Sequence, residues 1–201
     1  QMFKRTLAAF AIVALLFSLP AMADRKVKDQ SATINNFKEI DVVAPFFGNA
    51  HAYAVFAKIG KGGLGVGGSH GKGQVYVGGQ VIGFTSTSDI SIGLQAGGQS
   101  YAQIIFFQNA DSLEEFTSGN FEFDASASAV AVQSSAEASA GTEGSGTTAS
   151  GSKKAGKAAS GAKYQNGMAT FTMAKGGLMY AATIAGQKYT YDSLEDYAKK
   201  K

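Results

Sequence analysis

From residue 52 onward, apolar residues alternate with glycine or small polar residues, and only extended strands gather such a pattern into one apolar face. In the stretch 90–96 the residues Ile90 and Ile92 share one face, while Ser91 and Gly93 share the other. The same alternation returns in three further segments, 101–107, 121–127 and 178–184. The pattern predicts a sheet whose strands are buried on one side.

Glycine-rich triplets divide these segments. Because glycine enters the backbone conformations that tight turns need, we interpret three of them as turns. They are Lys61-Gly62-Gly63, Gly71-Lys72-Gly73 and Lys175-Gly176-Gly177.

Helices are expected near the start of the chain. Ser31 or Asp29 is suited to cap a short helix that carries Ile34 and Phe37 on one face. A second helical segment is predicted over 41–50.

A further helix is predicted in the middle of the chain. Asp111 is placed as its cap and Glu114 occupies the capping-box position, while Leu113 and Phe116 face inward and Gly119 ends the helix. Together the elements predict an α+β fold, a mainly antiparallel, glycine-rich β-sheet or partly closed barrel with a few short helices.

The first 23 residues have the order of a secretory signal peptide. Lys4 and Arg5 precede an apolar run over 7–19, and small residues follow up to Ala23. An uncleaved anchor is the alternative. We expect cleavage near Ala23, a periplasmic or secreted protein, and a single domain over 24–201.

The charge balance argues against a nucleic-acid partner. The net charge of the whole chain is +3, and two of its 18 basic residues lie in the predicted leader. Nucleic-acid binders carry a clustered excess of Lys and Arg, which is not seen here. Residues 138–162 are almost wholly Ala, Ser, Gly and Thr with a few lysines, so we predict a flexible loop.

The glycine-rich stretch 60–73 contains two patterns of functional sites. Gly60, Gly62 and Gly65 match the dinucleotide-binding spacing, but that motif must lead from a strand into a helix, and more strand follows here. Residues 67–71 match G-x-S-x-G, which makes Ser69 a candidate nucleophile. We therefore expect close-packed strand backbone here and no nucleotide site.

Other catalytic sets are sparse. A hydrolase of the G-x-S-x-G type needs a histidine later in the chain, whereas His51 precedes Ser69 and His70 adjoins it. With no cysteine and two histidines, we expect no metal and no cofactor. Glu122 and Asp124 lie at the spacing of an acid/base pair, and a solvent-exposed strand face is the simpler interpretation.

Several motifs in order resemble the SYLF-domain family. The resemblance runs over about residues 31–191. It is carried by Asn49–Phe56, Lys61–Gly68, Gly93–Gln99, Ile104–Phe107 and Ala174–Leu178. The resemblance implies a noncatalytic lipid-binding module: eukaryotic members bind phosphoinositide head groups, and some regulate actin. Since an exported protein would not meet actin, we carry over lipid binding alone.

Lysines near the glycine-rich triplets are the candidate lipid contacts. Lys58, Lys61, Lys72 and Lys175 would offer point charges beside backbone N–H donors to anionic or phosphorylated head groups of membrane lipids. Surface lysines that serve solubility are the alternative. Two other functions stay open, a serine hydrolase that uses Ser69 and a secreted structural or interaction protein. The lipid, the binding face and the oligomeric state do not follow from the sequence.

Overall fold

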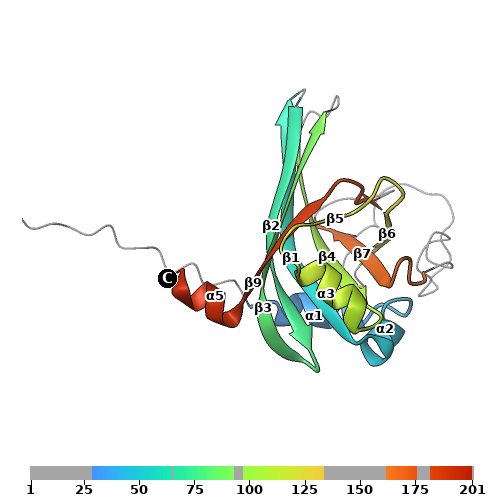
Figure 1. The fold of residues 1–201 in the computed structure, drawn as a ribbon. Coiled ribbons are helices and arrows are strands. Elements are labelled where there is room, and N and C mark those ends of the chain that lie inside the picture. The colour runs from blue at the N-terminus through green and yellow to red at the C-terminus, as the bar shows by residue number, and fades with distance from the viewer. Residues whose placement is uncertain (1–28, 65, 93–96, 134–161, 176–181, 201) are drawn as a thin grey trace, which may run out of the picture.

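The computed structural model describes residues 29–64, 66–92, 97–133, 162–175 and 182–200. Within them, strands form a strongly curled half-barrel that short helices flank (Figure 1). The predicted fold class is confirmed. The predicted leader and most of the predicted flexible loop lie outside the described residues.

Two helices come first, as predicted. Helix α1 spans Ser31–Lys38 and α2 spans Ala44–Asn49. Gln30 is the N-cap of α1 and makes no side-chain cap bond, while the Asp29 carboxylate accepts from the Ser31 backbone N–H at 2.9 Å. Apolar side chains of this segment, among them Phe37, are buried against the sheet.

Four long antiparallel strands form the centre of the sheet. They are β1 Ala52–Leu64, β2 Val66–Val77, β3 Gln80–Ile92 and β4 Gly97–Phe107. Their order in space is β3-β2-β1-β4, so the first strand pairs with both the second and the fourth. Figure 1 shows their far ends rising beyond the rest of the molecule.

Shorter elements complete the sheet. They are α3 Ala110–Thr117, β5 Phe121–Glu122, β6 Ser128–Val132, β7 Met168–Ala174, β8 Ala182–Thr183, β9 Lys188–Ser193 and α5 Leu194–Lys199. Strand β7 pairs with β4, and β9 pairs with β3. Among the described strands, the pair of β6 with β7 is parallel and the other pairs are antiparallel.

The two faces of the sheet carry separate apolar cores. Phe106 and Phe171 pack against α1 and α2, and we call this side the outer face. Phe56, Phe116 and Tyr189 pack together with α3 on the other side. That side is concave, because side chains of β4 and β9, which are four places apart in the sheet, meet across it; we call it the inner face.

Glycines on the inner face let neighbouring side chains lie over them. A Cβ at Gly73 would lie 2.5 Å from the Val55 carbonyl oxygen and 2.8 Å from the Phe56 ring. A Cβ at Gly83 would lie 2.5 Å from the Tyr191 ring. Such distances are below van der Waals contact, so only glycine fits.

The prediction of turns at two glycine triplets is wrong. Residues 61–63 belong to β1 and residues 71–73 to β2. In β2, Gly71 makes room for Ile59 and Gly73 for Phe56. The third triplet is described only at Lys175, which follows β7. The absence of a Cβ serves close packing within the strands rather than a change of chain direction.

Helix α3 begins differently from the prediction. Asn109 is its N-cap, and its side chain accepts from the Ser112 backbone N–H at 3.0 Å, while Asp111 stands in the first turn. Ser112 completes the capping box, because its hydroxyl accepts from the Asn109 N–H at 3.4 Å. Phe116 is buried, and Gly119 follows with a φ of 100°, as expected of a helix end.

Two predicted strands differ from the structure. The alternation over 121–127 yields only β5, because the Asp124 carboxylate accepts from the Ser126 backbone N–H and turns the chain. Of the segment predicted over 178–184, β8 is described, whereas 176–181 lie outside the described residues. The alternation over 101–107 is confirmed in β4.

Candidate functional site

A row of paired positions, most of them polar residues, crosses the upper part of the outer face. Register pairs Lys188 with Ser88, Ser88 with His70, His70 with Gly60 and Gly60 with Ser100. The Lys175 backbone N–H donates to the Ser100 carbonyl at 2.9 Å, which places Lys175 at the end of this row. Strands lie about 5 Å apart, so the row extends over the width of five strands.

Two of the predicted lysines flank the row. Lys72 pairs with Ser86 one step below His70, and Lys58 lies in the β1 bulge, where the register with β2 shifts between Val55 and Ile59. The bulge therefore faces the part of β2 that contains Lys72. We call Lys58, Lys72, Lys175, Lys188 and His70 the basic row, and all five are exposed.

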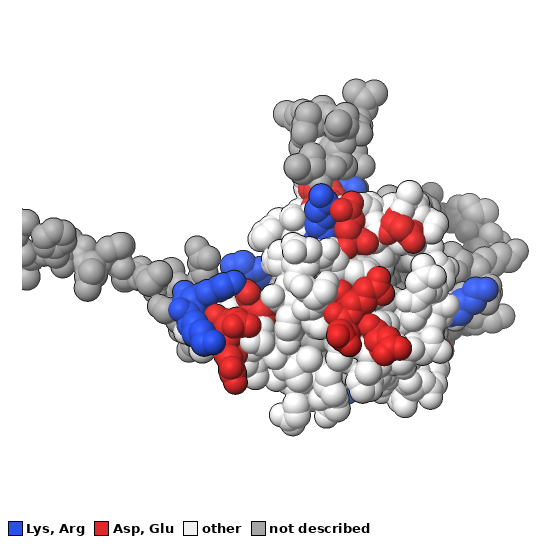
Figure 2. Space-filling view, viewed as in Figure 1, with Lys and Arg blue, Asp and Glu red and all other residues white. Residues whose placement is uncertain are grey.

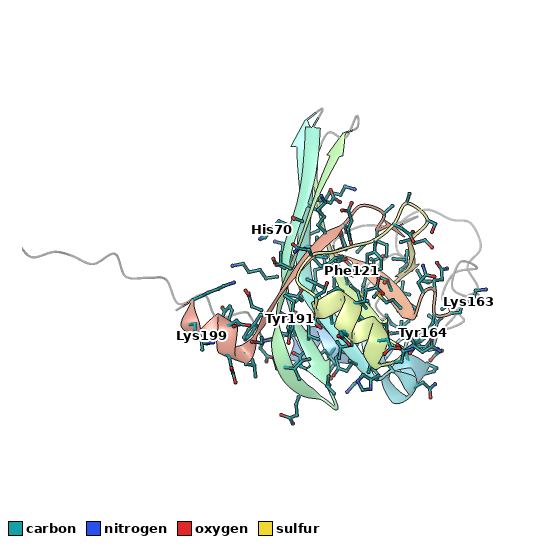
Figure 3. All side chains as sticks on the ribbon, viewed as in Figure 1. His70, Phe121, Lys163, Tyr164, Tyr191 and Lys199 are labelled. Carbon is teal, nitrogen blue, oxygen red and sulfur yellow. The ribbon has the colours of Figure 1, made fainter. Side chains whose placement is uncertain are left out.

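The structure does not place Lys61 with these residues. It pairs with Ser69, which is 5% exposed and belongs to the inner face. The structure thus brings Lys58 and Lys72 together on adjacent strands, sets Lys175 further along the same face, and directs Lys61 to the opposite side. Figure 3 shows His70 on the side of the sheet away from Phe121. His70 and Lys188 lie beside the predicted lysines because the register between neighbouring strands aligns them. The spacing of residues along the chain does not reveal that register.

The surroundings of the basic row are only partly neutralised. Lys188 lies 3.5 Å from the Glu122 carboxylate, and both side chains are largely exposed, so the pair contributes little to stability. Among the described residues, Lys58, Lys72 and Lys175 make no ion pair.

Further down the outer face, the Lys38 ammonium lies 5.4 Å from the centre of the Phe47 ring. None of the described helices has the length and apolarity needed to cross a membrane.

The inner face holds a buried hydrogen-bond network instead. The Gln103 amide donates to the Tyr189 hydroxyl at 2.9 Å, and that hydroxyl donates to the Gln187 side-chain oxygen at 2.6 Å. The Gln187 amide in turn donates to the Tyr101 hydroxyl at 2.7 Å. None of these residues was among the predicted site residues, and the available signal was the presence of polar residues at inward positions of alternating strands.

Burial sets the acidity of the two tyrosines. Loss of hydration raises the pKa of Tyr101 to about 12, although the bond from Gln187 opposes the shift. Burial raises the pKa of Tyr189 further, and the hydrogen bond from Gln103 again opposes the shift. Both side chains are neutral donors at physiological pH.

Hydroxyls around this network lack ordinary partners. The side-chain oxygens of four fully or nearly fully buried residues make no hydrogen bond with the described residues: Ser69, Thr85, Thr87 and Thr172. Thr87 and Ser69 lie close enough to Tyr189 and Tyr101 to affect their pKa values, yet not in hydrogen-bond geometry. Buried hydroxyls of this kind are normally satisfied by ordered water or by a ligand.

Among the described residues the candidate nucleophile has no histidine side chain beside it, and the carboxylate nearest in register is Asp89, which pairs with Ser69 across β2 and β3. Ser69 and His70 are consecutive residues of β2 and therefore point to opposite faces, one buried and the other exposed. Glu122 and Asp124 are exposed, and Asp124 is occupied by its bonds to Ser126. The described residues contain no group of three or more His, Cys, Asp or Glu side chains placed to hold a metal ion.

Comparisons with known proteins agree with the resemblance. The family profile described as Ysc84, Las17-binding protein actin regulator, matches residues 88–196, more than half of the 201 residues. A search of curated proteins returned no match. The matched segment begins within β3 and omits β1 and β2, although these two strands lie between β3 and β4 in the sheet. The SYLF domain is a non-enzymatic lipid- and actin-binding domain. The chain belongs to the SYLF-domain (Ysc84) family.

Proposed function

We propose that the protein is an exported, noncatalytic lipid-binding module that contacts anionic or phosphorylated head groups through the basic row. The observation that carries the proposal is the placement of Lys58, Lys72 and Lys175 on one exposed face of the sheet, beside His70. Membership of a lipid-binding family supports it.

The physical basis is electrostatic. Each lysine held at an anionic membrane contributes on the order of 1 kcal/mol, and the attraction fades within a Debye length. Strand register already holds the backbone of the row in place. Binding therefore costs little backbone conformational entropy at these residues. Lys61 would reach lipid only from the opposite face, so the proposal rests on the other three lysines.

The test compares two triple variants of equal charge. Lys58, Lys72 and Lys175 are changed to Gln in one protein, and Lys61, Lys163 and Lys199 in the other. Binding to vesicles of phosphatidylglycerol with phosphatidylcholine is measured by sedimentation at several salt concentrations. We expect the first variant to lose about tenfold or more in affinity, while the second stays within about threefold of the parent.

Two results would refute the proposal. Equal losses in both variants would mean that net charge alone drives binding. Equal sedimentation of the parent with anionic and with pure phosphatidylcholine vesicles, unaffected by salt, would remove anionic head groups as the ligand.

Export is the second part of the proposal. The order of charged, apolar and small residues up to Ala23 supports cleavage at that position. The N-terminal sequence of protein released by osmotic shock is expected to begin at Asp24. Full-length protein in the cytoplasmic fraction alone would contradict export and reopen actin, which the family description names and which our proposal leaves out.

A further inference from the structure

A pocket with a volume of about 180 Å³ opens on the inner side of the molecule. Its walls come from α3, from β5 and the chain up to β6, and from the start of β7. The residues that define its chemistry are Glu115, Glu122, Asp124, Phe121, Phe123 and Thr170. The basic row lies on the outer face and meets this pocket at the pair of Lys188 with Glu122, whereas Lys58, Lys72 and Lys175 do not line the pocket.

The charged part of the wall is acidic. Three carboxylates line the pocket, and no lysine or arginine is among the residues that line it. Glu115 makes no ion pair with the described residues, whereas Glu122 shares its charge with Lys188 at 3.5 Å. Figure 2 shows acidic side chains gathered on the face over α3 and β5.

Asp124 stays ionised. Its Oδ1 accepts from the Ser126 hydroxyl at 2.6 Å and from the Ser126 backbone N–H at 2.8 Å. These bonds favour the carboxylate and lower the pKa of Asp124 below its usual range. The pocket therefore carries negative charge at neutral pH and disfavours an anion.

Another part of the wall is apolar and aromatic, beside neutral polar residues such as Ser128, Gln165 and Asn166. Phe121 and Phe123 meet edge to face with ring centroids 5.0 Å apart, and Met168 and Ile184 also line the pocket. The negative face of an aromatic ring attracts a cation, and the apolar groups favour alkyl carbons. Carboxylates and phenyl rings in one small pocket suit an ion that is both charged and partly apolar.

One neutral polar group of the pocket wall has no partner among the described residues. Thr170 lines the pocket and is 6% exposed, and its hydroxyl makes no hydrogen bond with the described residues. Its oxygen keeps access to the pocket, so the hydroxyl is available to bond water or a bound molecule. This observation is independent of the acidic charge.

We propose that this pocket binds a small organic ammonium ion, with the charged nitrogen near Glu115 and Asp124 and its alkyl groups against Phe121 and Phe123. The volume is below the range of about 300–1,000 Å³ that drug-sized ligands occupy, so a head-group-sized ion fits. The inference does not depend on lipid binding by the basic row.

Choline chloride and its uncharged isostere 3,3-dimethylbutan-1-ol are the probes, and chemical-shift perturbation of the full chain is the measurement. We expect choline at about 10 mM to shift the amide signals around Phe121 and Asp124, and the isostere to leave them unchanged. Glu115→Gln is expected to weaken binding at least about fivefold. Glu114→Gln is the control, since Glu114 neighbours Glu115 on α3 but does not line the pocket.

Phosphatidylcholine vesicles distinguish a lipid source from a free amine. If the parent binds these vesicles and Glu115→Gln does not, the ammonium ion belongs to a lipid head group. If the protein binds choline but not the vesicles, the ligand is a soluble amine. No shift with choline, equal shifts with the isostere, or equal weakening by both Glu variants would overturn the inference. The triple lysine variant should bind choline like the parent, so failure of the two proposals is distinguishable.

Discussion

The two faces of the upper sheet differ in chemistry although alternate residues of the same strands build them. His70 and Lys72 of β2 reach solvent on the outer face, whereas Ser69 and Gly71, which alternate with them, are buried on the inner face. In the upper sheet the outer face carries His70, Lys58 and Lys72, whereas the inner face carries the buried network of Tyr101, Gln103 and Tyr189. One strand thus presents a charged surface while its other side closes the core.

This difference teaches that the glycines and the lysines of residues 58–73 have separate roles. Glycines at inward positions admit the rings and side chains of neighbouring strands. Lysines at outward positions have no packing role, which leaves them available to a ligand. Changes on the inner face should therefore affect stability, and changes on the outer face should affect binding.

The largest effect is expected at an inner glycine. Gly73→Val would drive a side chain into the Val55 carbonyl and the Phe56 ring, and we expect it to cost about 3 kcal/mol or more. Gly60→Ala is the outer-face counterpart, because a Cβ there meets nothing within 4 Å, and its effect should stay within about 0.5 kcal/mol. Urea unfolding measures both. Similar costs at the two positions would contradict the assignment of faces.

The second effect concerns the buried network. Tyr189→Phe removes the hydroxyl that joins Gln103 to Gln187, and we expect a loss of about 2 kcal/mol because buried amide groups lose a partner. Ser86→Ala on the outer face removes an exposed 2.7 Å bond to Thr190 and should cost about 0.5 kcal/mol or less. Thermal unfolding compares the two variants, and an equal loss would mean that burial does not set the difference.

The third effect is a loss of stability at alkaline pH. Because burial raises the pKa of Tyr101 to about 12 from 10.0, the folded state holds its proton more tightly than the unfolded state does. This contribution is complete below pH 10 and is lost as pH rises from 10 towards 12. Tyr101→Phe should flatten the decline of the unfolding free energy over this range. An unchanged slope would show that other groups control it.

The smallest effect on stability is expected in the basic row. Lys72→Gln should change the unfolding free energy by no more than about 0.5 kcal/mol, because the side chain is exposed and makes no ion pair with the described residues. The same variant should bind anionic vesicles a few times more weakly than the parent. Calorimetry and vesicle sedimentation on one preparation separate the two quantities. A variant that unfolds easily and binds normally would reverse the roles given to the two faces.

Much of the fold follows from local patterns. Alternation over 101–107 and the apolar positions of α1 are read from the sequence because strand and helix periods are local properties. Glycine is ambiguous, since the same residue serves a turn or a close approach, and this is why 61–63 were expected as a turn. The alignment of Lys188 with His70 depends on register between distant segments, which no local pattern contains.

The functional residues show the same limit. Lys58 and Lys72 can be chosen as candidates from the sequence. Their position on one face depends on the β1 bulge, and the sequence pattern does not show where that bulge lies. The acidic pocket joins Glu115 of α3 to Asp124 and to Thr170 of β7, residues far apart in the chain. Sites of this kind become visible only when the chain folds.

The most direct test of the account asks which face meets a membrane. The chain has no cysteine, so a single introduced cysteine gives a single labelling position. Ser88→Cys lies on β3 between His70 and Lys188 of the basic row, and Ser126→Cys lies in the wall of the acidic pocket. With an environment-sensitive fluorophore and phosphatidylglycerol vesicles, we predict a blue shift and quenching by lipid-borne quenchers at position 88 and no change at position 126. A shift at 126 alone, or equal shifts at both, would contradict the central claim that the outer face binds anionic head groups.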